Sequence, residues 1–213
     1  MKSIFKVVVL ITSVVSMLSG STDLYNQVEK MNKGLDGYIV GKALTAKQQK
    51  SITKNSIASN NKNIFKFLVN DDLVIAINKN NNRVIAINKR YKSLAQEDVK
   101  KMIGEFIFKY DEPTAMAHDK MVYWVYDKDG TKLSENDLKK WKNSLKVKNT
   151  GLPLAQAIHA TGEKIDFNPY LSLKMNSTEA IMTELKEPKQ STVNIIVSSD
   201  RLIQDTTGMT DIK

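Results

Sequence analysis

The chain has 213 residues with a formal net charge of +9, and 41% of its residues are hydrophobic. This length and apolar fraction fit one domain or two small ones and exclude a wholly disordered chain. The chain holds no Cys and only two His, which excludes disulfides, thiolate nucleophiles, Cys-ligated zinc and multi-histidine metal centres.

The first 21 residues have the three-part layout of a secretory signal peptide. Lys2 and Lys6 form a positive start, residues 7–18 carry no charge, and residues 19–21 are small. The apolar run is shorter than the roughly 20 residues of a bilayer-spanning helix, so cleavage is favoured over an uncleaved anchor. Residues 1–21 are therefore predicted to be a signal peptide, with a periplasmic or secreted bacterial protein and no integral transmembrane segment after cleavage.

Residues 22–63 are predicted to be an N-terminal segment of helix and linker. An apolar stripe at the 3.6-residue period indicates a helix over residues 22–35; its members are Leu24, Val28, Met31 and Leu35. Gly34 and Gly37 are expected to end this helix. Residues 45–59 are polar and predict a weak helix or a linker.

The clearest structural unit is a predicted β-hairpin in which the hexapeptide VIAINK occurs twice within residues 74–89. β-branched residues alternate on both sides of a turn rich in Asn, which tolerates left-handed backbone geometry. A register that pairs Ile75 with Ile87 and Ile77 with Ile85 puts four isoleucines on one face.

A helix is predicted from Ser93, which would cap it together with Gln96 in a capping box, to Gly104. The capping pair Ser134 and Asp137 predicts the start of a second helix. The other elements expected up to residue 148 are strands at residues 65–69, 106–110 and 121–126, a turn at residues 127–130 and the body of the second helix at residues 135–145.

Beyond residue 148 the pattern is looser. Residues 149–153 are a linker candidate, and the last dozen residues are expected to be a frayed tail. The elements predicted between them are a helix at residues 154–160, strands at residues 165–167, 171–175 and 192–198, and a helix at residues 177–186. The sum is an α+β fold, an antiparallel sheet of β-hairpins with helices packed on one face. Residues 64–148 form its predicted core, and residues 149–213 a C-terminal lobe or a continuation of the same domain.

Two groups of residues are candidates for catalysis. Glu112, His118 and Asp119 lie in a connection, where an imidazole beside carboxylates suits general-base chemistry; an ordinary surface loop is the alternative. His159 with Glu163 is the second group, and a partly buried structural His is the alternative there. Neither group has the spacing of a known metal motif, so no metal or cofactor is expected.

The predicted helix at residues 135–145, with the residues just after it, is amphipathic and strongly basic. Such a helix suits an anionic membrane or glycan surface, and packing of its apolar stripe on the sheet is the alternative. The candidate surface-binding residues are Lys139, Lys140, Trp141, Lys142 and Lys146.

Nucleic acid is not an expected partner, because only three of the 32 basic residues are Arg, the residue that reads guanine and stacks on bases. The sequence favours a non-enzymatic envelope protein of binding or assembly type that contacts a partner protein or an anionic envelope surface. The alternatives are a periplasmic hydrolase that uses a His and carboxylates, and a small-ligand binding module. The aromatic pocket of that module would be lined by Phe106, Phe108, Tyr123, Trp124 and Tyr126.

Overall fold

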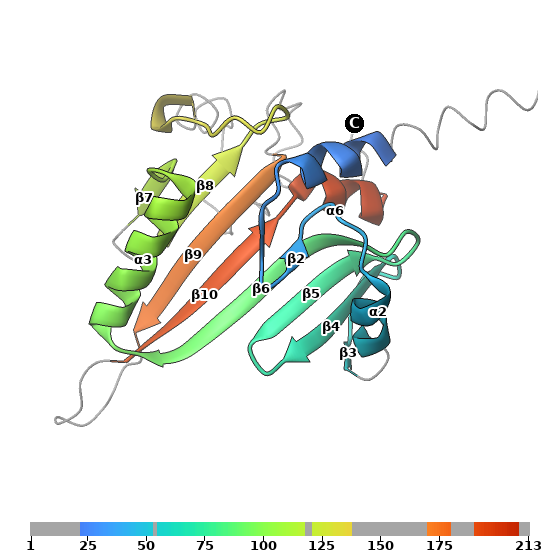
Figure 1. The fold of residues 1–213 in the computed structure, drawn as a ribbon, viewed down its shortest axis with the longest axis horizontal. Helices are drawn as coiled ribbons and strands as arrows, with labels where there is room; N and C mark the ends of the chain where they lie inside the picture. Colours follow the sequence, from blue (N-terminus) through green and yellow to red (C-terminus); the bar gives the residue numbers. More distant parts are fainter. Residues whose placement is uncertain (1–21, 53–54, 118–120, 138–169, 180–189, 209–213) are drawn as a thin grey trace, which may run out of the picture.

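The computed structural model describes residues 22–52, 55–117, 121–137, 170–179 and 190–208 (Figure 1). The predicted signal peptide at residues 1–21, the linker at residues 149–153 and the basic helix beyond residue 137 lie outside these ranges. The elements predicted at residues 154–160 and 165–167 lie outside them too.

Eight antiparallel strands form one sheet in the order β3-β4-β5-β6-β10-β9-β8-β7. The strands are β3 (Ser56–Ile57), β4 (Ile64–Asn70), β5 (Leu73–Asn78), β6 (Arg83–Leu94), β7 (Ala115–Ala117), β8 (Met121–Tyr126), β9 (Leu171–Glu179) and β10 (Ser191–Ser198). A separate hairpin pairs β1 (Gly34–Leu35) with β2 (Tyr38–Ile39). β10 lies between β6 and β9, so segments about 100 residues apart in sequence share ladders along most of its length.

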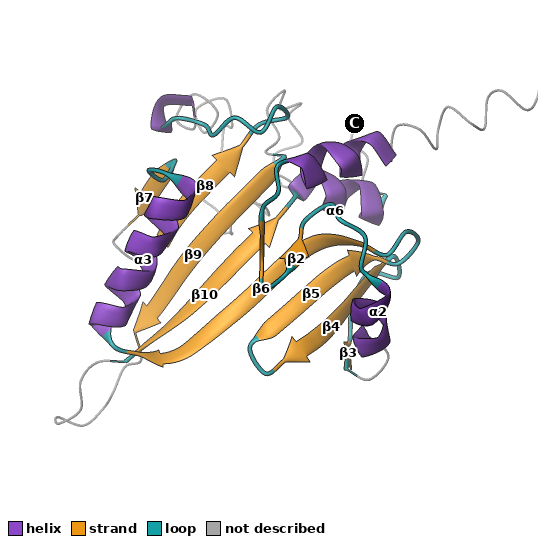
Figure 2. Ribbon diagram, in the orientation of Figure 1, coloured by secondary structure: helices purple, strands orange, loops and turns teal. Residues whose placement is uncertain are grey.

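Helices cover one face of this sheet, which confirms the predicted α+β architecture (Figure 2). Residues 22–30 are helical, and α3 (Gln96–Tyr110) and α6 (Asp200–Thr207) follow later in the chain. Each helix contributes buried side chains to the core that the sheet forms. The short helix α2 (Ala46–Ile52) packs beside β4.

The core face of the sheet follows from strict alternation along its strands. One row of directly paired residues crosses six strands, and every member has 0% exposure: Phe67, Ile75, Ile87, Val197, Leu173 and Trp124. Full burial of each such side chain stabilises the fold by about 1.5–3 kcal/mol. This row therefore fixes which face of each strand meets the helices.

The predicted hairpin register is correct at one end and wrong at the other. Ile75 pairs with Ile87 as expected, but Ile77 pairs with Val84 because β6 bulges between Val84 and Ala86. The backbone of Val84 is held on its other edge, where its N–H donates to Lys42 O and its carbonyl accepts from Gly41 N. The bulge allows β6 to pair with β5 on one edge and to hydrogen-bond with Gly41 and Lys42 on the other. Val84 and Ile85 both stay buried.

The predicted limits of the helix after this hairpin are wrong at both ends. Ser93 lies in β6 with φ of 56°, and the N-cap is Ala95, which makes no side-chain cap. Gly104 lies inside α3 rather than at its end, and the strand predicted at residues 106–110 is helical. A glycine inside a helix costs only about 1 kcal/mol, while Phe106 and Ile107 extend the apolar face at helical spacing and pack on the core.

The C-terminal segment is more ordered than its sequence predicted. Of the last dozen residues, which are expected to fray, those at 202–207 belong to α6, whose N-cap Ser199 accepts a hydrogen bond from Leu202 N at 3.2 Å and whose C-cap is Gly208; residues 209–213 lie outside the described ranges. The helix predicted from Ser177 is also wrong at its start, because β9 continues to Glu179 in register with β10. In both places packing on the sheet outweighs local propensity.

Two local predictions are confirmed around residue 130. Asp127 Oδ1 accepts hydrogen bonds from Asp129 N and Thr131 N, which forms the expected turn before Gly130. Ser134 Oγ donates to Asp137 Oδ2 at 2.6 Å and accepts from Asp137 N at 3.1 Å. This reciprocal pair is a capping box, and residues 135–137 begin a helix.

A buried hydrogen-bond chain joins the first and last described helices to the β5–β6 hairpin. Asn78 Nδ2 donates to Tyr25 Oη at 2.8 Å, and Tyr25 Oη lies 3.0 Å from Thr206 Oγ1. The Thr206 hydroxyl donates to Leu202 O, so Tyr25 must donate its own hydrogen to Thr206. All three polar side chains are therefore satisfied inside the core.

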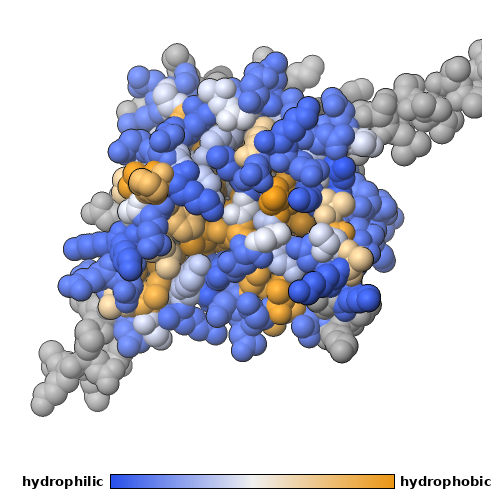
Figure 3. All heavy atoms as spheres, viewed as in Figure 1, coloured by the Kyte–Doolittle hydropathy of each residue, from blue (hydrophilic) through white to orange (hydrophobic). Residues whose placement is uncertain are grey.

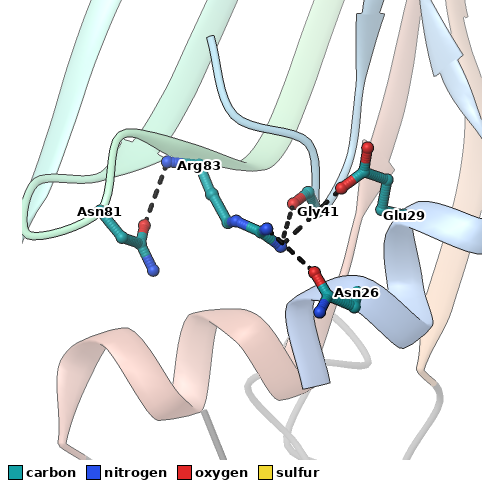
Figure 4. A network of polar contacts seen from close by, with 5 residues as sticks. All are labelled: Asn26, Glu29, Gly41, Asn81 and Arg83. Carbon is teal, nitrogen blue, oxygen red and sulfur yellow. Dashed lines mark hydrogen bonds and ion pairs between the residues drawn. The ribbon is translucent and has the colours of Figure 1, made fainter. Parts of the chain in front are cut away.

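Arg83 makes a second link to the helix at residues 22–30 (Figure 4). Its guanidinium donates to Asn26 Oδ1 at 2.9 Å and to Gly41 O at 3.2 Å, and lies 3.8 Å from Glu29 Oε2. Gly41 has φ of 89°, and a Cβ there would lie 2.6 Å from Glu29 N. Only glycine allows the chain after β2 to pass this close to the helix.

We expect Tyr25→Phe to lower the free energy of unfolding by about 1–3 kcal/mol, because it leaves Asn78 and Thr206 without their buried partner. Tyr126→Phe is the matched control, since the Tyr126 hydroxyl is buried without a hydrogen-bond partner among the described residues. It should leave stability at neutral pH unchanged or slightly higher. Urea denaturation measures the free energy of unfolding of both variants. Equal losses of stability in the two variants would contradict the role given to the Tyr25 hydroxyl.

Candidate functional site

Among the predicted catalytic residues, Glu112 alone belongs to the part of the chain that the structure describes. Its side chain is exposed, and its carbonyl oxygen accepts a hydrogen bond from Lys132 Nζ at 2.6 Å. The other predicted site residues lie outside the described ranges: His118, Asp119, His159, Glu163, Lys139, Lys140, Trp141, Lys142 and Lys146. Both catalytic groups therefore stay predictions, because at least one partner of each lies outside the described residues.

Two general properties hold for the described residues. Nowhere among them do three or more His, Asp or Glu side chains gather in a way that could hold a metal ion. No helix in the same ranges combines the length and the apolar character that crossing a membrane requires.

The five aromatic residues proposed to line one pocket are distributed over different environments. Trp124 and Tyr126 are buried in the core, and Tyr123, which precedes Trp124, faces the opposite side of the sheet. Phe108 is 94% exposed on α3, whereas Phe106 packs against Trp124 with ring centroids 6.1 Å apart. They do not form a common pocket, because alternation in β8 and the turn of α3 separate them.

The β1–β2 hairpin forms a wall that the sequence analysis did not predict. Asp36 and Gly37 form its two-residue turn with φ of 51° and 81°, the geometry of a type I′ turn. An Asp-Gly dipeptide between Leu35 and Tyr38 is the sequence signal for such a hairpin. It was missed because these residues were assigned to the end of the preceding helix.

A hollow of about 380 Å³ opens between this hairpin and α3. Hairpin residues 34–39 form one wall, Tyr91 of β6 belongs to the lining, and Glu105, Phe106 and Lys109 project from α3. Figure 3 shows apolar surface in this depression, with polar surface around it. Its size is within the range of small-molecule sites.

Lys33 holds the base of the hairpin against α3 and β8. Its Nζ lies 5.2 Å from the ring centroid of Tyr110 and 4.8 Å from that of Tyr126, a cation–π arrangement with two rings. Burial lowers the pKa of Lys33, the nearby ammonium of Lys109 lowers it further, and Asp111 opposes both. The amines of Lys33 and Lys109 therefore lie near each other at the C-terminal end of α3, beside the hollow.

An ion pair fixes the other side of the hairpin. Lys89 Nζ donates to Asp36 Oδ2 and lies 5.0 Å from the ring centroid of Tyr91. Burial acts to lower the pKa of Lys89, but the hydrogen bonds to Asp36 and Tyr91 outweigh it, so the net shift is upward. Asp36 is thus already neutralised within the lining of the hollow.

The opposite face of the sheet is open over the described residues. One paired row crosses seven strands with half-buried or exposed side chains: Leu68, Val74, Asn88, Ile196, Lys174, Tyr123 and Ala115. The adjacent rows add Lys66 and Arg90, and the strand residues of the three rows include no acid. Asp72, just before β5, lies opposite Arg90 and accepts a hydrogen bond from Arg90 N at 2.7 Å through its carbonyl oxygen. We call this surface the open sheet face.

Two cations of the open sheet face are positioned by cross-strand neighbours. Arg90 Nε donates to Asn194 Oδ1 at 3.0 Å, and Lys174 Nζ lies 5.5 Å from the ring centroid of Tyr123. Asn194 is the residue paired directly with Arg90 on the adjacent strand, and Tyr123 is the residue paired directly with Lys174. Neither cation has an ion-pair partner among the described residues.

We expect the free energy of unfolding to fall between pH 10 and 12 through Tyr126. Burial first, and then the fields of Tyr110 and Asp111, raise its pKa from 10.0 to about 12 in the folded protein. The unfolded chain releases this proton near pH 10 while the folded protein retains it, so stability is lost as pH rises, by up to about 1.4 kcal/mol per pH unit. Tyr126→Phe should remove this part of the slope in urea denaturation, whereas parallel curves for both proteins from pH 8 to 12 would contradict it.

Comparison with known proteins gives no relative: no family model matches the chain, and neither a curated protein nor a solved structure matches it significantly. Any function must therefore be argued from the residues of this chain alone.

Proposed function

We propose that this chain is an exported bacterial envelope protein that binds rather than catalyses. Its open sheet face attaches to an anionic surface that displays phosphate groups, such as lipid headgroups. The observation that carries this proposal is the excess of cations on this face: Lys66, Arg90 and Lys174 lie on its strands, and the acid in register with them is Asp72, opposite Arg90. The predicted signal peptide supplies the route to the envelope.

The spacing of these cations suits a surface rather than a single small anion. Arg90 and Lys174 stand on strands separated by β10, which places them about 10 Å apart at the usual spacing of neighbouring strands. Lys66 lies on β4, which is two strands from β6 on the side away from β10, and it belongs to a different row. Each basic residue near an anionic membrane contributes about 1 kcal/mol, so three acting together give useful affinity.

Nucleic acid fits this face less well. A single-strand binding platform stacks successive bases on several rings, and Tyr123 is the one aromatic residue in the three rows of the open sheet face. Its directly paired neighbours are Lys174 and Ala115, and Asn88, Ile196 and Asn194 farther across the face offer no further stacking surface.

The decisive measurement is cosedimentation of the mature chain with vesicles that contain anionic phospholipid, compared with zwitterionic vesicles. We expect binding to the anionic vesicles alone and its loss at high salt. The triple variant Lys66→Gln, Arg90→Gln, Lys174→Gln should weaken binding about 100-fold, following from about 1 kcal/mol per cation.

The matched control replaces three exposed lysines outside this face, in Lys42→Gln, Lys79→Gln and Lys100→Gln. It has the same net charge as the first variant and should retain most of the binding. Equal losses in both variants would mean that net charge alone drives association and would contradict a specific face. Tighter binding to a single-stranded oligonucleotide than to vesicles would favour nucleic acid instead.

A further inference from the structure

The hollow between the β1–β2 hairpin and α3 is lined by one pair of opposite charges that are not paired with each other. Glu105 and Lys109 both line it from α3, four residues apart. Such pairs often join across one helical turn, yet these two form no ion pair with each other or with another described residue. Both side chains are exposed, and Lys109 Nζ lies 5.0 Å from the ring centroid of Tyr110, a cation–π contact that leaves its N–H groups without a carboxylate partner among the described residues.

The remaining lining of the hollow mixes polar and apolar surface and adds no other unpaired charge. Asp36 is occupied by Lys89, and aromatic rings are supplied by Tyr38, Tyr91 and Phe106. A ligand that fits this chemistry carries one positive and one negative group and an apolar side chain between or beside them.

We propose that this hollow binds a zwitterionic peptide of about two residues. Its ammonium pairs with Glu105, its carboxylate pairs with Lys109, and an apolar side chain packs on Phe106 and Tyr91. Residues four apart on a helix are separated by about 6 Å along its axis, and the charged ends of an extended dipeptide by about 7 Å. The second amine at this end, Lys33, adds to the positive field that favours the carboxylate there.

This site is independent of the proposed attachment surface, because the two lie on opposite faces of the sheet. The hollow lies on the face that the helices cover, whereas Lys66, Arg90 and Lys174 project from the other. A protein attached through the open sheet face would still present the hollow to soluble peptide.

The test is isothermal calorimetry of the mature chain with alanyl-phenylalanine, its N-acetyl form and its C-terminal amide. We expect the free dipeptide to bind in the range of about 0.1–1 mM and each blocked form to bind at least about tenfold more weakly. Absence of binding at about 10 mM, or equal binding of the blocked forms, would overturn the proposal.

Two variants assign the charges to their partners. Glu105→Gln removes the proposed partner of the ammonium, so the free and the N-acetylated peptide should bind this variant equally weakly. Lys109→Met removes the proposed partner of the carboxylate, so the free and the amidated peptide should bind that variant equally weakly. The control is Glu97→Gln with Lys101→Met, an exposed pair with the same spacing on α3 that does not line the hollow. It should bind like the unchanged protein, and a loss there equal to that of the Glu105 and Lys109 variants would exclude the assigned contacts. Circular dichroism checks that each variant is folded, so a loss of binding reports on the hollow.

Discussion

The position of β10 in the middle of the sheet is the constraint on which the rest of the structure depends. Without it, the strands from β3 to β6 and the strands from β7 to β9 would be two separate ladders. Its inward side chains Val193, Ile195 and Val197 have 0% exposure, so insertion of this strand completes both the hydrogen-bond ladders and the core. The entropy of closing so long a connection is offset by two full ladders and by this burial.

Once the sheet is closed, the N-terminal segment has one face on which to pack. Tyr25 reaches Asn78 and Thr206, which places the first described helix across the β5–β6 hairpin and beside α6. The chain then returns over β6 as the β1–β2 hairpin, held by Lys33 on one side and Lys89 on the other. The hollow lies between this hairpin and α3, which stand on the same face of the sheet and approach each other at Lys33 and Tyr110.

Local sequence signals predicted local structure well and distant pairing poorly. The two VIAINK segments, the Asp127 turn and the Ser134–Asp137 capping box depend on neighbours a few residues away, and all formed as hairpin, turn and cap. The bulge at Val84, the passage of α3 through Gly104 and the packing of α6 depend on partners far along the chain. Periodicity carries no information on those partners, so the hollow, which is built from the hairpin, β6 and α3, was not predicted. The Asp36–Gly37 dipeptide was the one local signal for it.

The composition of the open sheet face is not explained by folding alone. Positions that alternate away from the core tolerate most polar residues, and mixing charges of both signs across neighbouring strands would add favourable cross-strand pairs. The described rows hold Lys66, Arg90 and Lys174, with Asp72 opposite Arg90. Like charges at these spacings repel weakly in water, and the contacts of Arg90 with Asn194 and of Lys174 with Tyr123 do not require an excess of positive charge. This excess of cations is the feature on which the proposed attachment to an anionic surface rests.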